Sequence, residues 1–461
     1  MFFYYYVLMQ KIFIILFLLI LGAECFAFDI VYPKKNNVVI NAKSAFFIGS
    51  SKTPFTINGK NVPLHPSGGF AYVVDLKEGD NTFVMQSDDE RKIYVITKPR
   101  IKTEGWTSPQ FKKYDAQKTF YVITDKAPLR STPVESGINR MAHLQRNILL
   151  NVDGEKGGLY RVVLGDEKYG WIAKTNVKTA DENYVNTPAK LLGCDFEEDN
   201  EFYNFIFHFD KKVPYEISEG EKLSVKFFNV EEGVYSKDFP YSEITGGKKL
   251  AGYGGEYLNN DFIWKIRKPL NVNHKKPLKN INITIDAGHG GNEFGAIGCL
   301  GDKEKDINLS IAKFLENELN KRGANVVMTR DDDIYTGLSE RVAVANYTNS
   351  SIFISIHGNA LPDGLNPNEH SGVSIYYYYD EAKPLANVLI NSITEQLGIN
   401  NDKVRQASFA VVRNTNALSV LIETAYLINP EDNSKLISKD FQKAYAKAIA
   451  DGLEIYLKES L

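Results

Sequence analysis

Two histidines and two glutamates occur at the ends of predicted strands or at the start of a predicted helix. His289 follows a β-branched strand in the run Ile-Asp-Ala-Gly-His-Gly-Gly, and His357 ends the run Ser-Ile-Phe-Ile-Ser-Ile-His. Glu304 opens a helix, and Glu423 ends the run Ser-Val-Leu-Ile-Glu. In an open α/β sheet, groups at the carboxyl ends of strands lie at one rim. Two imidazoles and a carboxylate suit catalytic zinc, and a second carboxylate is what a hydrolytic site needs as a base.

Each of these residues also has a structural explanation. A histidine after a strand is commonly a hydrogen-bonded loop residue. Glu304 suits the positive end of a helix, and Glu423 is equally explained as a buried acid or a salt-bridge partner. Spacing alone therefore leaves the metal site and the structural explanation open.

Alternating strands and amphipathic helices over residues 281–461 must bring these side chains together. Apolar residues at four-residue steps from Ile307 to Leu319 give the first helix one buried face. The pattern predicts an α/β catalytic domain with helices on both faces of a sheet. Expected strands are 281–286, 325–329, 351–356, 373–379 and 419–422, and expected helices are 305–322, 338–347, 381–397 and 439–456.

The preceding residues have the short strands and turn signals of small all-β domains. We expect a sandwich-like domain over 28–110, a small barrel over 113–180 and a β-rich domain over 187–270. Alternating aromatic residues in the last of these indicate a packed sheet face, and His208 within them is expected to be structural. Residues 271–280 are polar, basic and proline-containing, so we expect a linker there, with His274 solvated.

A signal peptide is expected at residues 1–27. Lys11 precedes an apolar stretch, and small residues lead to a cleavage site after Ala27. The mature protein is then expected to be exported to the periplasm, the cell envelope or the extracellular side, with no stable membrane anchor. A lipid anchor on Cys25 is a competing interpretation that the adjacent Glu24 disfavours, and a retained membrane helix is another.

Composition excludes several classes of protein. A chain of 461 residues is too long for one core, and its net charge of −3 gives no reason to expect nucleic acid as a partner. Cys194 and Cys299 fall in different predicted domains, which argues against a disulfide framework. Cys299 is expected to be a buried apolar residue.

Further runs continue the pattern around His289. They are Gly-Ala from 295, Glu-Lys-Asp from 304, Thr-Arg from 329, Ser-Ile-His-Gly-Asn-Ala from 355 and Ile-Glu-Thr-Ala-Tyr-Leu-Ile-Asn from 422. In order and spacing, over residues 281–457, they resemble the zinc-dependent N-acetylmuramoyl-L-alanine amidases of type 3. Ala287 stands where that family usually has proline.

The resemblance implies a peptidoglycan hydrolase that cleaves the amide between N-acetylmuramic acid and L-alanine of the stem peptide. It implies one Zn²⁺ held by His289, Glu304 and His357, with Glu423 as general base for a zinc-activated water. Asn359 and Arg330 are candidates for placing substrate or for orienting groups around the metal. The alternatives are a zinc carboxypeptidase or deacetylase acting on the cell wall, and a non-catalytic wall-binding protein.

The predicted barrel carries a second, smaller resemblance. Its phrases Ala-Pro-Leu-Arg-Ser-Thr-Pro from 127 and Tyr-Gly-Trp-Ile-Ala from 169 resemble bacterial SH3-like domains of cell-wall proteins. Peptidoglycan is the expected partner of the whole chain. The β domains are expected either to bind wall or protein, or to act as spacers.

The segment after His357 is short. Some members of the amidase family carry a long helical insertion there that blocks the metal until a partner displaces it. Here only the Pro-, Gly- and Asn-rich residues 358–371 precede the next strand, too few for a blocking helix. We therefore expect an enzyme without that form of autoinhibition.

Overall fold

The C-terminal part of the chain is built on a six-stranded sheet. The structure is a computed structural model that describes residues 27–100, 108–165, 167–181, 184–413 and 416–459. In spatial order the strands are β24 (Asn325–Met328), β23 (Asn282–Ala287), β25 (Ile352–Asn359), β28 (Leu418–Tyr426), β26 (Val373–Tyr377) and β27 (Asn401–Gln406). The first four run parallel, and β26 runs antiparallel to β28. We call residues 281–459 the catalytic unit.

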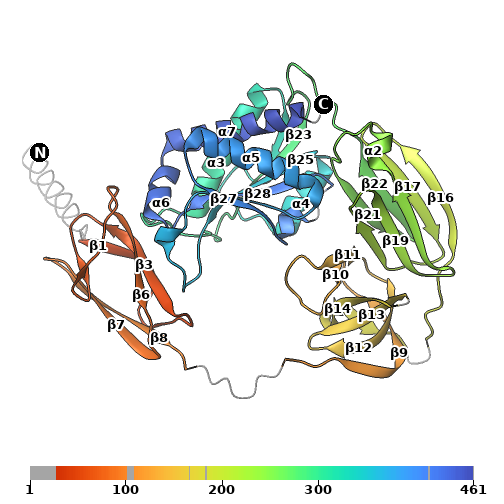
Figure 1. Ribbon diagram of the computed structural model, residues 1–461, viewed down its shortest axis with the longest axis horizontal. Coiled ribbons are helices and arrows are strands. Elements are labelled where there is room, and N and C mark those ends of the chain that lie inside the picture. The colour runs from red at the N-terminus through yellow and green to blue at the C-terminus, as the bar shows by residue number, and fades with distance from the viewer. Residues whose placement is uncertain (1–26, 101–107, 166, 182–183, 414–415, 460–461) are drawn as a thin grey trace, which may run out of the picture.

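Helices cover both faces of this sheet, as predicted (Figure 1). One face carries α3 (Glu304–Lys321), α5 (Lys383–Leu397) and α7 (Lys439–Lys458), and the other carries α4 (Leu338–Tyr347) beside the turn η4 (Ala410–Val412). Alternation along β25 explains the two layers, because Ile352 and Ile354 join the core under α3 while Phe353 joins the core under α4.

Two elements were not expected from the sequence. Strand β27 is polar and lies at the sheet edge, so it lacks the alternation that marks a half-buried strand. Helix α6 (Pro430–Leu436) was not predicted because it is short. Its start does carry a sequence signal, since the Asn429 side chain caps the helix and Pro430 is its first residue. Residues 271–280 lie partly against the catalytic core, burying Val272 and Leu278, while His274 is exposed as expected.

Every preceding described strand belongs to a β-sheet, so the expectation of β structure ahead of the catalytic unit is confirmed. Residues 28–98 form two sheets around one apolar core that includes Phe47 and Phe70. We call this part the N-terminal sandwich. Its sheets contain β1 (Phe28–Tyr32), β3 (Ser44–Ser51) and β6 (Gly69–Asp75), and β2 (Val38–Val39), β8 (Arg91–Lys98), β7 (Gly79–Gln86), β4 (Thr56–Ile57) and β5 (Lys60–Asn61).

The next two parts share a single apolar core, in which Val162 from the first and Phe207 from the second are both fully buried. The middle sheet contains β11 (Arg140–Leu144), β10 (Ala127–Arg130), β14 (Lys168–Ala173), β13 (Leu159–Gly165), β12 (Leu149–Lys156), β9 (Lys112–Val122) and β15 (Val177–Thr179), with η1 (Lys174–Asn176) before the last. The third block has two sheets and one short helix. They are β16 (Leu191–Glu198), β17 (Phe202–Phe209), β22 (Asp261–Arg267) and β21 (Tyr253–Leu258), then β18 (Tyr215–Ser218), β19 (Leu223–Val230) and β20 (Gly233–Phe239), and α2 (Tyr241–Ile244).

The N-terminal sandwich packs at the carboxyl rim of the catalytic sheet. Its Phe46 and Ala71 form one apolar cluster with Cys299 and Ile428, which follow β23 and β28. The cluster buries Cys299 fully, in agreement with its expected apolar role.

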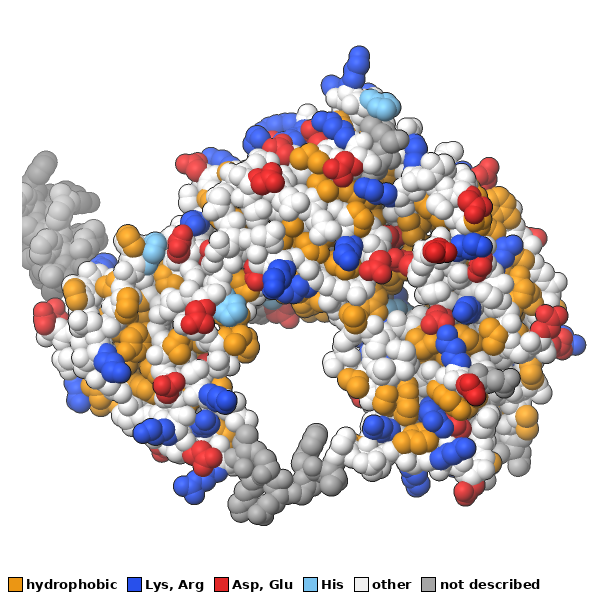
Figure 2. Space-filling model, in the orientation of Figure 1, with side chains coloured by type: hydrophobic (Ala, Val, Ile, Leu, Met, Phe, Trp, Pro, Cys, Tyr) orange, Lys and Arg blue, Asp and Glu red, His pale blue; other side chains and the backbone are white. Residues whose placement is uncertain are grey.

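The third block packs at the amino rim of the same sheet. Arg267 donates to the carbonyls of Ser350 and Asn416, which precede β25 and β28. The β parts therefore hold the catalytic unit from opposite ends, and Figure 1 and Figure 2 show it between them.

No helix among the described residues is long and apolar enough to cross a membrane. The predicted signal peptide lies outside the described residues, apart from Ala27.

Candidate active site

The structure brings His289, Glu304 and His357 together at the carboxyl rim. One Glu304 oxygen, Oε1, lies 3.2 Å from His289 Nε2 and 3.0 Å from His357 Nδ1. The two imidazole rings are 4.9 Å apart and nearly perpendicular. One ligand atom from each residue lies within 4.8 Å of the other two, so the three side chains can hold a metal ion.

Local backbone geometry places these three side chains. His289 has a positive φ of 59°, which turns the chain sharply after β23. Gly288 allows the His357 ring to approach, because a Cβ there would lie 2.4 Å from the ring nitrogen Nε2. Glu304 is the first residue of α3, where the helix dipole favours a carboxylate.

Glu304 is buried, with 3% of its surface exposed, and is held in its charged form. Burial favours the neutral acid, but hydrogen bonds from His289 and His357 outweigh it and hold the pKa well below its usual range. Backbone N–H groups add to this carboxylate site, with Ala296 donating to Oε2 at 2.7 Å and Gly358 to Oε1 at 3.1 Å.

Glu423 lies next to the three-residue cluster because β25 and β28 pair in register, with His357 opposite Glu423. Its Oε2 is buried and has no hydrogen-bond partner among the described residues. Burial raises the pKa of Glu423 to about 7, while the charge of His357 opposes the rise and that of Glu304 adds to it. An unpartnered buried carboxylate oxygen is costly, which makes Glu423 a candidate for a functional rather than a structural role.

Comparisons with known proteins agree with this geometry. The sequence model of the N-acetylmuramoyl-L-alanine amidase family matches residues 283–455. The probable cell wall amidase LytH of Staphylococcus aureus is 36% identical over 216 residues, which is 46% of this chain and 69% of LytH. The chain belongs to the N-acetylmuramoyl-L-alanine amidase family.

Solved structures of family members also match. The amidase AmiC2 of Nostoc punctiforme is 38% identical and covers 39% of this chain and 97% of its own, with a TM-score of 0.37. The catalytic domain of the amidase CwlV from Bacillus (Paenibacillus) polymyxa var. colistinus is 35% identical, with coverage of 38% and 98% and a TM-score of 0.37.

Two buried arginines hold the loop that carries the first histidine of this amidase-family site. Arg330 is only 2% exposed and donates to the carbonyls of Ala287 and Gly288 at 2.8 and 3.0 Å. Arg341 is 3% exposed and donates to the carbonyls of Ala287 at 2.7 Å and His289 at 2.8 Å. Both guanidinium groups therefore bind this loop through its backbone carbonyls.

Asp286 neutralises Arg341 at 2.6 Å and is itself completely buried. It also accepts hydrogen bonds from Thr329 Oγ1 at 2.6 Å and Ser355 Oγ at 2.7 Å. Sequence reasoning missed Arg341 and Asp286. The one sequence signal was the position of Arg341 on the side of α4 that faces the strands, and an analysis of hydrophobic periodicity does not register a charged residue there.

The remaining residues named from the sequence lie in varied places. Asn359 ends β25, two residues after His357, and its carbonyl accepts from the Leu427 N–H at 3.0 Å. His208 is far from the site, between Asp261 at 2.8 Å and Asp195 at 3.1 Å on the third block. These carboxylates raise its pKa, as for a surface ion pair.

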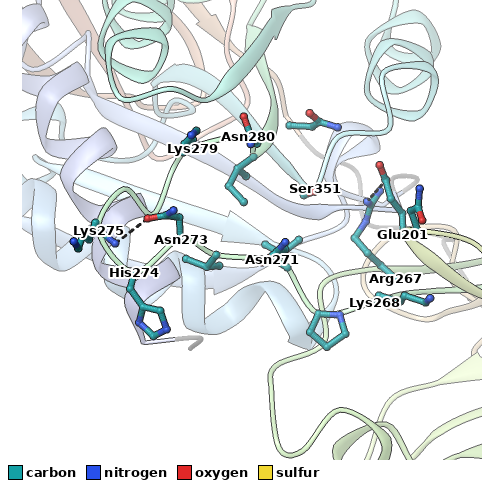
Figure 3. Close-up of a pocket in the computed structure, with 16 residues that line it drawn as sticks. Glu201, Arg267, Lys268, Asn271, Asn273, His274, Lys275, Lys279, Asn280 and Ser351 are labelled. Atoms are coloured by element: carbon teal, nitrogen blue, oxygen red, sulfur yellow. Dashed lines mark hydrogen bonds and ion pairs between the residues drawn. The ribbon is translucent and has the colours of Figure 1, made fainter.

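A separate pocket of 710 Å³ lies at the opposite rim, where residues 267–282 pass beside Glu201 and Ser351. Figure 3 shows His274, Lys275 and Lys279 along it, and Arg267 against Glu201. Because Ser351 precedes β25 whereas His357 lies near its end, this pocket is distinct from the His–Glu–His cluster.

Proposed function

We propose that this chain is an exported, zinc-dependent enzyme that hydrolyses the amide between N-acetylmuramic acid and the L-alanine of peptidoglycan stem peptides. One observation carries the proposal: His289, Glu304 and His357 converge beside the unpartnered carboxylate of Glu423. They do so within a chain of the amidase family.

The donor set fits zinc. Two imidazole nitrogens and one carboxylate oxygen are the ligands of many catalytic zinc sites, which keep a position open for water or substrate. Asn308 donates to Glu304 Oε1 at 3.2 Å and so orients the ligand carboxylate from behind. When bound, zinc would lower the pKa of a water molecule and polarise the scissile carbonyl.

The protein supplies the proton transfers. The free Oε2 of Glu423 is the acceptor for a proton from the attacking water. The same oxygen then returns that proton to the departing alanine nitrogen, which leaves as an amine. Arg330 and Arg341 hold the His289 loop during these steps, and Asn359 is placed at the rim to meet the substrate.

Digestion of purified peptidoglycan by the full chain, with and without a chelator, tests the proposal. Mass analysis should find peptides with a free N-terminal alanine, and only in the sample without chelator. A carboxypeptidase would instead shorten the stem from its other end, and a deacetylase would release acetate. Either of these products, or no soluble product at all, would contradict the proposal.

Glu423→Gln tests the general base. We expect hydrolysis to fall by about 10²–10⁴, the range that general base catalysis contributes, with zinc content unchanged. The matched control is Glu431→Gln, because the Glu431 side chain is 67% exposed on α6 and should leave the rate unaltered. Full activity in Glu423→Gln would overturn this role.

We further propose that the β parts position the catalytic unit on the wall. The proposed units are the sandwich over 28–110, an SH3-like part over 113–180 and the block over 187–270, with 271–280 joining the last to the catalytic unit. The shared core of the middle sheet and the third block supports a joint role for these two. Export through a signal peptide at 1–27 is the corresponding route to the wall.

A further inference from the structure

A second cavity lies where the middle sheet, the third block and the catalytic unit meet. Its volume is 570 Å³, within the range of small-molecule sites. The middle sheet contributes Arg140, the third block contributes Tyr215 and Tyr253, and the catalytic unit contributes Tyr378 and Arg413. It has no residue in common with the proposed metal site, and none of the reaction steps above uses it.

Positive charge in this cavity is not neutralised by the protein. Of the two acids that line it, Asp125 pairs with Arg146 at 3.1 Å and Glu256 pairs with Lys265 at 3.8 Å. No described carboxylate lies within 4.0 Å of the guanidinium of Arg140 or Arg413.

The arrangement is electrostatically unfavourable for an empty cavity. Burial, with the charges of the neighbouring Arg140 and Arg130, lowers the pKa of Arg413 to about 10 although Tyr378 and Tyr379 oppose the shift. Like charges gathered in this way are relieved by an anion from outside the chain.

Both arginines leave Nη2 of the guanidinium without a hydrogen bond among the described residues. Nη1 of Arg413 donates to the Ser408 carbonyl, and Nη1 of Arg140 lies 3.5 Å from His143 Nε2. Nε of each arginine is shielded from solvent and has no partner among the described residues, so a ligand in the cavity can meet each guanidinium only through Nη2, for which no hydrogen bond occurs there.

Another arginine of the chain shows what an arginine guanidinium binds. In the middle sheet, Arg161 donates from Nε to Asp153 Oδ1 at 2.8 Å and from Nη2 to Oδ2 at 2.7 Å. Two parallel bonds of this kind match the two oxygens of a carboxylate. Arg140 and Arg413 have no carboxylate of the described residues within 4.0 Å, so their Nη2 donors are left for a carboxylate from outside the chain.

We propose that this cavity binds a peptide through a carboxylate held by Arg140 and Arg413. Tyr215, Tyr253 and Tyr378 supply aromatic walls for the rest of the peptide. A stem peptide of peptidoglycan has this chemistry, so the identity of the ligand rests on the proposed function. Because the cavity is at the amino rim, it is a second point of contact with the wall, remote from the scissile bond.

Isothermal titration calorimetry on the full chain tests the proposal with purified stem peptide as the probe. We expect wild-type protein to bind the peptide and to ignore the same peptide with its carboxylates converted to methyl esters. Arg140→Gln and Arg413→Gln should each weaken binding at least tenfold. Arg91→Gln, an exposed arginine of the N-terminal sandwich, should not change it.

Thermal melts separate binding from folding. Arg140→Gln removes like-charge repulsion, so its Tm should equal or exceed that of the wild type. Unchanged affinity in both arginine variants, or binding of inorganic phosphate but not of peptide, would overturn the proposal. Hydrolysis measured on the same samples keeps the two proposals apart. An active enzyme that binds no stem peptide refutes this inference alone, whereas binding without hydrolysis supports it and refutes the amidase assignment.

Discussion

At the scale of residues, the position of His289 depends on groups that never touch the metal site. Its backbone has a positive φ, which non-glycine residues rarely adopt. The Arg341 guanidinium holds the His289 carbonyl at 2.8 Å and Asp286 at 2.6 Å. The buried ion pair of Arg341 and Asp286 is thus joined directly to the loop that carries His289.

Replacing Arg341 by lysine tests this positioning role. Lysine keeps the charge that Asp286 requires but cannot also reach the carbonyls of Ala287 and His289, because its three donors share one nitrogen. We expect zinc affinity to fall about 10–100-fold, measured by competition with a chromophoric chelator. The visible spectrum of the cobalt-substituted protein should also change.

Arg322→Lys is the control for that experiment, since Arg322 forms its 2.7 Å ion pair with Asp451 on α7, among the helices that cover one face of the sheet. If Arg341→Lys binds zinc as tightly as this control, Arg341 is only a structural residue.

Sequence alone named the four side chains of the candidate site, because each belongs to a short run with recognisable order and spacing. It did not reveal Arg341 or Asp286. A charged residue on a helix is usually solvated, and only the packed structure shows that this one is 3% exposed.

At the scale of elements, the loop between β25 and β26 is tied to the N-terminal sandwich. Tyr32 donates to Asp363 at 2.5 Å, and Asn368 donates to the Ala71 carbonyl at 3.0 Å. The only regular structure among the described residues of the loop between β25 and β26 is the turn η2 (Pro367–Glu369). The loop that follows β25 is therefore anchored to the sandwich at two points, Asp363 and Asn368.

This anchoring predicts an enzyme that works without an activator protein. Purified full chain should release soluble fragments from peptidoglycan at a rate that added envelope extract does not increase. Activity that appears only after a partner is added would contradict the prediction.

Periodicity located most strands and helices of the catalytic unit, because their alternating or four-residue patterns reflect two-sided burial. Strand β27 was not predicted because Asn401, Asp402 and Lys403 at its start are polar and the strand lies at the edge of the sheet. The packing of residues 271–280 also escaped, since a polar segment gives no sign that Leu278 will be completely buried.

At the scale of the whole molecule, two carboxylates meet where the third block contacts the catalytic unit. The Glu381 N–H donates to Glu219 Oε2 at 3.1 Å, and Tyr253 donates to Glu219 Oε1 at 2.6 Å. Burial raises the pKa of both acids, and the Glu219 charge raises that of Glu381 further. The Arg267 guanidinium lowers the pKa of Glu381 but offsets only part of this rise.

The pair predicts a loss of stability as pH rises. A carboxyl group whose pKa is higher in the folded state stabilises the fold below its unfolded pKa, and this contribution disappears as pH rises through the folded value. Glu381→Gln should therefore raise the Tm at pH 8, by about 2–4 °C for a gain of about 1 kcal/mol. It should have little effect near pH 4.

Differential scanning calorimetry at both pH values provides the measurement, with Glu395→Gln on the exposed side of α5 as control. An equal change in Tm at the two pH values would show that Glu381 does not titrate in this range.

The two hydrogen bonds that tie the N-terminal sandwich to the loop between β25 and β26 join residues that lie far apart along the chain. Asp363 and Tyr32 are separated by 331 residues, and Asn368 and Ala71 by 297. During synthesis the sandwich emerges first, while the loop that it supports is among the last segments made. Contacts between such distant segments form late in folding. The rim around His357 thus gains this support only after the loop between β25 and β26 has been synthesised and has met the sandwich.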